Sequence, residues 1–154
     1  MIRVWLFLHL LGFTLWLGGG LAAMVAGVAG KQEERAGVGA ITRAQASIHK
    51  AVIAPGALLA VLSGLILTFS VSGRMGQLAG FSIWLMIMQG AGLLGALLVL
   101  LIGLPTAAKL SRLDPLGPGG AYFDELRTRQ KIVSSVAGTL ALLALVAGTL
   151  VRSG

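Results

Sequence analysis

The chain has 154 residues, of which 56% are hydrophobic and 11% are charged. Its mean hydropathy of +0.93 lies outside the range of soluble domains and predicts an integral membrane protein. The net charge of +7 does not indicate nucleic acid, because the basic residues lie between long apolar runs, and the absence of cysteine excludes disulfides and thiolate metal ligands.

Four apolar runs are long enough to cross a bilayer, since about 20 residues span its hydrocarbon core. The first run carries a single charge, Arg3, and the other three carry none. A cleaved signal peptide is less favoured for the first run, which is longer than the usual apolar region of such peptides. The sequence predicts an all-α integral membrane four-helix bundle, formed by one domain over residues 1–154, with spans at about 2–29, 51–71, 81–105 and 132–151.

The Lys and Arg residues are divided unevenly between the two sides of these spans. Three lie on the side of the termini, namely Arg3, Arg74 and Arg152, and nine lie on the other side. The positive-inside rule therefore predicts that both termini are on the outer side and that segments 31–50 and 106–131 are cytoplasmic. We expect both segments to be partly helical, with a possible Glu125 to Arg129 ion pair, and DPLGPGG at 114–120 to form a turn.

Small residues and prolines suggest how the spans pack. Residues four apart would let neighbouring helices approach closely, namely Gly56, Ala60 and Gly64 on the second span and Ala144 and Gly148 on the fourth. Pro55 and Pro105 lie near the expected cytoplasmic ends, where a proline can kink or end a helix with little loss of hydrogen bonding.

His9 is the residue within the spans that most needs an explanation. The spans contain no Asp, Glu or Lys, so a proton relay or a charged substrate pathway lacks its usual parts. Among their polar residues only His9 can bind a metal strongly or titrate near neutral pH. An imidazole in hydrocarbon costs free energy unless it is paired. His9 is therefore either a ligand or a neutral side chain bonded to a Ser, Thr or Gln of a neighbouring helix.

Depth in the membrane limits which side chains could join His9. It lies about seven residues, or roughly 10 Å, inside the outer end of its span. His49 precedes the second span on the opposite side, about 20 Å away along the membrane normal, and is expected to be an interfacial residue beside Lys50. Met88 should reach nearly the depth of His9. Imidazole plus thioether suits haem iron or Cu(I), whereas core packing is the alternative for the methionine.

Other residues near that level would permit a haem. The missing side chains of three glycines could make room for a porphyrin edge, namely Gly12, Gly64 and Gly148. Arg3, Arg74 or Arg152 could meet haem propionates at the outer surface.

The first span reads HLLGFTLWLGGG, with His9, Trp16 and a run of three glycines. It resembles the opening helix of the CopD-like copper-resistance membrane proteins and of a related bacterial family. The second span, within KAVIAPGALLAVLSGLILT, resembles the stretch that follows a basic loop in these families. The His-to-Trp spacing also resembles HemJ-type protoporphyrinogen IX oxidases, which are small four-helix haem b proteins. That pattern pairs the histidine with a lysine after Trp-Leu-x-x, and here Trp84-Leu85-Met86-Ile87 is followed by Met88.

These resemblances imply a bacterial inner (plasma) membrane and either haem b or copper as cofactor. The expected function is electron transfer or metal or haem handling, through His9 and Met88, with Arg3 and Arg74 near the propionates. Any enzyme activity would be that of a haem-dependent membrane oxidoreductase. The alternative is a structural subunit or assembly factor of a larger membrane complex, with no cofactor. Partners expected are the lipid bilayer and either a homo-oligomer or a larger membrane complex.

Overall fold

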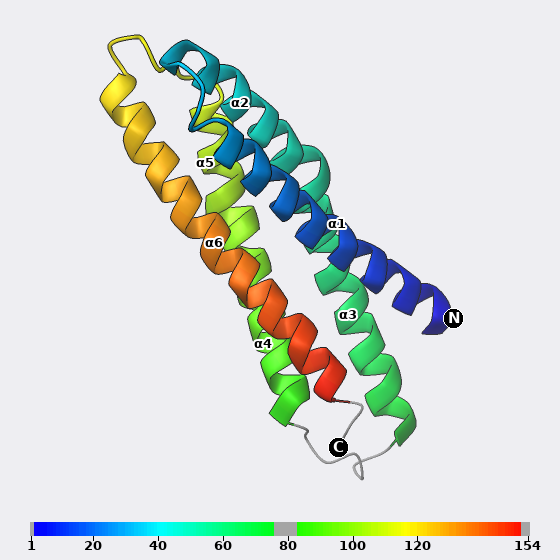
Figure 1. The fold of residues 1–154 in the computed structure, drawn as a ribbon. Coiled ribbons are helices and arrows are strands. Elements are labelled where there is room, and N and C mark those ends of the chain that lie inside the picture. The colour runs from blue at the N-terminus through cyan, green and yellow to red at the C-terminus, as the bar shows by residue number, and fades with distance from the viewer. Residues whose placement is uncertain (1, 76–82, 152–154) are drawn as a thin grey trace.

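The structure of this chain is a computed structural model that describes residues 2–75 and 83–151, with residues 71–75 described by their backbone alone. Its regular structure over these ranges is entirely helical (Figure 1). The α-helices are α1 (Ile2–Ala29), α2 (Arg35–Ile48), α3 (Ala54–Met75), α4 (Ile83–Leu97), α5 (Leu104–Leu110) and α6 (Gly120–Leu150).

Two short π-helical segments make longer helices out of these pieces. η1 (His49–Ile53) joins α2 to α3, and η3 (Leu98–Gly103) joins α4 to α5. Four helices in the described ranges are then long and apolar enough to cross a membrane, namely Ile2–Ala29, Arg35–Ser70, Ile83–Leu110 and Gly120–Leu150. The predicted all-α four-helix membrane fold is confirmed. Helices also occupy most of the two segments that were expected to be only partly helical.

Each π segment is followed by a proline. Pro55 lies two residues beyond the end of η1, and Pro105 lies two residues beyond the end of η3. A proline has no N–H, and its ring clashes with the carbonyl four residues earlier. A π turn is one of the local adjustments that lets a helix pass such a position. Both helices therefore continue through their prolines instead of ending there.

Glycines bring the helices together in two close pairs. A Cβ atom added to Gly12 of α1 would lie 2.8 Å from the carbonyl oxygen of Gly56 on α3, so these two backbones are in contact. In the other pair, a Cβ added to Gly148 of α6 would lie 3.1 Å from Sδ of Met88 on α4. The close-packing roles predicted for Gly56 and Gly148 are confirmed.

Trp16 joins the two pairs at the centre of the bundle. Its side chain is 3% exposed and belongs to the main hydrophobic core, beside Ile53 and Ala141. A Cβ added to Gly95 of α4 would lie 2.9 Å from Cη2 of the indole ring, so the ring of Trp16 occupies the notch that this glycine leaves. The indole ring of Trp16 on α1 thus contacts the pair formed by α4 and α6.

The connections between α1 and α2 and between α5 and α6 lie together, opposite the first residues of α1 and the last residues of α6 (Figure 1). We call this the basic end of the bundle, because it carries the cationic segments. Arg35 holds it together, donating from Nε to the carbonyl oxygen of Pro115 at 2.9 Å and pairing with Asp124 at 2.9 Å. The predicted turn is confirmed, since Asp114 accepts from the backbone N–H of Leu116 at 2.9 Å.

Candidate functional site

His9 is half-buried on α1, with its ring held against α3. Its Nδ1 lies 2.8 Å from the carbonyl oxygen of Ala60, which can only accept, so the proton is on Nδ1. The hydroxyl of Ser63 lies 3.4 Å from the same nitrogen, and Phe13 packs against the ring edge at 5.4 Å between centroids. Within the described part of the chain, Nε2 has no hydrogen-bond partner. His9 is therefore paired to the neighbouring helix through one nitrogen and unpaired at the other.

Met88 makes its contact in the other helix pair, where its sulfur faces Gly148 of α6. The contacts described for His9 and Met88 do not bring the two side chains together. The space at Gly64 is also filled, because a Cβ there would lie 2.9 Å from Cε1 of His9. The room predicted for a porphyrin edge at Gly64 and Gly148 is thus taken by the imidazole and the thioether themselves.

Of the three arginines predicted near the propionates, the structure describes one side chain. Arg3 is exposed on the first turn of α1. The backbone of Arg74 belongs to α3, but its side chain lies outside the described residues, as does the whole of Arg152.

His49 is the more deeply buried histidine, with 5% of its surface exposed. Its Nδ1 lies 3.2 Å from the carbonyl oxygen of Gln45 and therefore carries the proton. Its Nε2 accepts from the side-chain amide of Gln130 on α6 at 3.0 Å, and Oγ of Ser134 lies 3.5 Å from the same nitrogen. His49 thus connects the long second helix to α6, and it is a packed residue of the bundle, whereas its predicted depth at the membrane interface stays a prediction.

Two glutamines complete this polar cluster. Gln45 donates from Nε2 to the carbonyl oxygen of Ala23 on α1 at 2.7 Å, close to Gly27. Gln130 donates to His49, but its Oε1 is buried without a hydrogen-bond partner in the described part of the structure. Leaving a buried acceptor unpaired costs about 1–3 kcal/mol. Oε1 of Gln130 is therefore an acceptor for which the described residues supply no donor.

The cluster lines a cavity of about 640 Å³ between α1, the second helix (Arg35–Ser70) and α6, with η3 and α5 also contributing to its wall. Its lining contains basic residues, uncharged polar residues and apolar residues, including Lys31, Arg127 and Lys131, then Gln45, His49, Gln130 and Ser134, then Leu17, Ala23, Val99 and Leu142. On α6 the lining runs from Arg127, the residue nearest the basic end, past Gln130, Lys131 and Ser134 to Leu142, at about 1.5 Å per residue. The cationic residues of the lining therefore lie toward the basic end, and its far part is uncharged and mainly apolar.

Two glycines keep this cavity open. Gly20 of α1 and Gly138 of α6 both line it, and a Cβ added to either would meet nothing within 4 Å. Gly18 has equally open surroundings but does not line the cavity. The edge of the cavity reaches the outer surface of the bundle, because the lining residues Met24 and Leu142 are 60% and 55% exposed.

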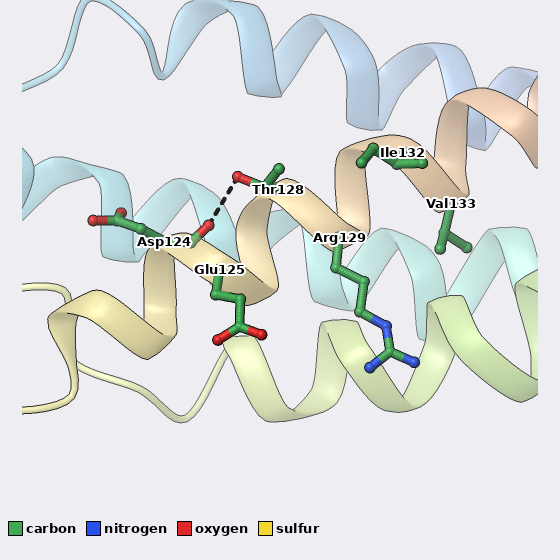
Figure 2. Close-up of a pocket in the computed structure, with 6 residues that line it drawn as sticks. All are labelled: Asp124, Glu125, Thr128, Arg129, Ile132 and Val133. Carbon is green, nitrogen blue, oxygen red and sulfur yellow. Dashed lines mark hydrogen bonds between the residues drawn. The ribbon is translucent and has the colours of Figure 1, made fainter.

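A shallower hollow lies near the basic end, with all of its lining side chains on α6 (Figure 2). Thr128 there donates to the backbone carbonyl of Asp124 at 3.0 Å, as the dashed line in Figure 2 shows. The prediction that Glu125 pairs with Arg129 is wrong. Among the described residues these two side chains form no ion pair, and the pair that does form joins Arg35 to Asp124. With one lining helix and ordinary surface chemistry, this hollow indicates no site.

Comparison with family models, with curated proteins and with solved structures finds no match for this chain. The resemblance to CopD-like and HemJ-like proteins therefore stays a prediction. In the described residues, no three His, Cys, Asp or Glu side chains group to hold a metal.

The sequence also contains two signals that point to the cavity. Gln45 and His49 are four residues apart, so they share a helix face. Arg127, Gln130, Ser134 and Gly138 share a second face at spacings of three and four residues.

Proposed function

We propose that this chain is a membrane-embedded binding protein that takes an anionic amphiphile into the cavity between α1, the second helix and α6. The observation that carries the proposal is the order of the lining, in which Lys31, Arg127 and Lys131 lie toward the basic end and mainly apolar walls lie farther along the bundle. An amphiphile with a negative head and an apolar body has the same order. Basic side chains at a membrane surface attract anionic headgroups, and apolar walls accept hydrocarbon.

The membrane itself would supply this ligand. The positive-inside rule assigns the basic end to the cytoplasmic side, so the charged edge of the cavity would lie at the level of the inner-leaflet headgroups. The exposed edge at Met24 and Leu142 would face lipid between α1 and α6. A ligand could then enter sideways from the bilayer without its apolar part passing through water.

Filling the cavity should abolish binding. In Gly20→Leu the new side chain occupies the open space beside the polar cluster, whereas in Gly18→Leu it projects from the same helix without entering the cavity. Native mass spectrometry of the protein in mild detergent should find one amphiphile on most wild-type and Gly18→Leu chains. Gly20→Leu should retain less than about a tenth as much, since a filled site forfeits the whole binding free energy.

Equal retention by Gly20→Leu and Gly18→Leu would contradict the proposal. If none of the three proteins carried an amphiphile, the result would favour the alternative predicted from the sequence, a structural subunit or assembly factor without a ligand of its own.

We also propose, on a separate observation, that His9 binds a b-type haem or a copper ion in electron transfer or in metal or haem handling. Its Nδ1–H is held by the carbonyl of Ala60 while Nε2 is unpaired in the described structure, and metal-binding histidines are commonly oriented in this way. Met88 would have to turn from Gly148 to serve as the second ligand, or another chain would supply one. The haem would provide one-electron chemistry.

The visible spectrum tests the role of His9. Protein purified in detergent from haem-replete cells should show a Soret band or bound copper, which His9→Ala should remove and His49→Ala should leave unchanged. The two substitutions both delete an imidazole whose Nδ1 bonds a backbone carbonyl, so His49→Ala is the matched control. A colourless, copper-free wild-type protein would refute this second proposal, as would a Soret band that survives in His9→Ala.

A further inference from the structure

We infer that the ligand of the cavity is a glycerophospholipid whose anionic headgroup carries a free hydroxyl, as in phosphatidylglycerol. The inference rests on the proposed function of the cavity and adds the chemical class of its ligand. It is carried by two features of the lining, the basic edge and the unpaired acceptor of Gln130.

The charge of the edge selects an anion. Lys31, Arg127 and Lys131 line the cavity, and its described lining contains no Asp or Glu. His49 adds no charge to this count, because its Nε2 accepts the hydrogen bond of Gln130 and its Nδ1–H is used by Gln45. A phosphodiester group with one negative charge would be attracted to this edge, whereas the ammonium of an ethanolamine or choline headgroup would be repelled by it.

The acceptor of Gln130 selects a hydrogen-bond donor on the same headgroup. Its Oε1 is buried and unpaired, and the amide nitrogen of the same side chain is already committed to His49. A carboxylate or an alkyl phosphodiester has only acceptors and would leave this oxygen unpaired. A hydroxyl would donate to it, and removing the cost of an unpaired buried acceptor would favour the ligand that carries one.

The spacing of the two features suits one headgroup. Gln130 follows Arg127 by three residues on the same face of α6, which places it about 4.5 Å farther from the basic end. A short polyol between the phosphate and its free hydroxyl covers such a distance. The acyl chains would lie along the exposed edge formed by Met24 and Leu142.

Phosphatidylmethanol is the matched probe, because it has the charge and acyl chains of phosphatidylglycerol but lacks the headgroup hydroxyls. Titration of delipidated full-length protein in detergent, followed by native mass spectrometry, should show phosphatidylglycerol bound about three- to tenfold more tightly than phosphatidylmethanol. Gln130→Leu should bind the two lipids equally. Arg127→Gln should weaken both roughly fivefold and keep their ratio, while Arg129→Gln, which removes a charge outside the cavity, should change neither.

Equal affinities of the wild-type protein for the two lipids would overturn the inference without need of any variant, and so would tighter binding of phosphatidylethanolamine. If Gly20→Leu still abolished binding in that case, the proposed amphiphile site would stand with a different ligand. If neither lipid bound in a manner sensitive to Gly20→Leu, the proposed function itself would fail.

Discussion

Replacing Gly12 by alanine is expected to force α1 away from α3 and to destabilise the protein severely. The added Cβ would lie 2.8 Å from the carbonyl oxygen of Gly56 and 3.0 Å from Cα of Ala60. Both are backbone atoms, so no flexible side chain can move aside. Overpacking of this kind costs about 3 kcal/mol, which corresponds to a fall in Tm of roughly 10 °C for a chain of this size. Thermal unfolding in detergent, followed by circular dichroism, measures the change.

Gly18→Ala is the matched control, since it makes the same chemical change on the same helix with nothing within 4 Å of the new Cβ. Alanine forms helices more readily than glycine, so this variant should be as stable as the wild-type protein or slightly more stable. A Gly12→Ala protein that unfolds at the same temperature as Gly18→Ala would show that α1 and α3 do not meet as described.

Replacing Trp16 by alanine should have a comparable effect for the opposite reason, because it empties the centre of the bundle. The indole is 3% exposed and fills the notch at Gly95, where α1 meets α4. Losing a large aromatic side chain from a packed core costs about 3–5 kcal/mol. Within a membrane the loss is chiefly of van der Waals contact, since lipid tails are as apolar as the indole. The thermal midpoint in detergent should fall by about 10 °C or more.

Trp84 offers the control for this substitution, because it is 39% exposed on α4. Trp84→Ala should change stability by less than about 1 kcal/mol, as is usual for surface positions. If Trp84→Ala were the more damaging of the two, the core would not be centred on Trp16.

Hydropathy predicted the four helices because a chain in lipid must satisfy its backbone hydrogen bonds within each span. It could not predict which helices pair, since the spans within α1, α3, α4 and α6 are all apolar and their pairing depends on small residues such as Gly12 and Gly95. The structure adds that information. In the structure α1 packs against α3 and α4 packs against α6, each pair through contacts at glycines.

The candidate sites show a similar division. Depth along the membrane could be estimated for His9 and Met88 from the helix rise, but the direction of a side chain around its helix could not, and they face different neighbours. The burial of His49 was missed because its surroundings come from α6, far away in sequence, whose Gln130 and Ser134 reach it across the cavity.

The π segments have a consequence for reading the faces of these helices. A π turn carries an extra residue relative to an α-helical turn, which offsets the helical phase on its two sides by about one residue, or roughly 100°. Positions before and after η1 therefore cannot be projected onto one helical wheel, and the same holds across η3.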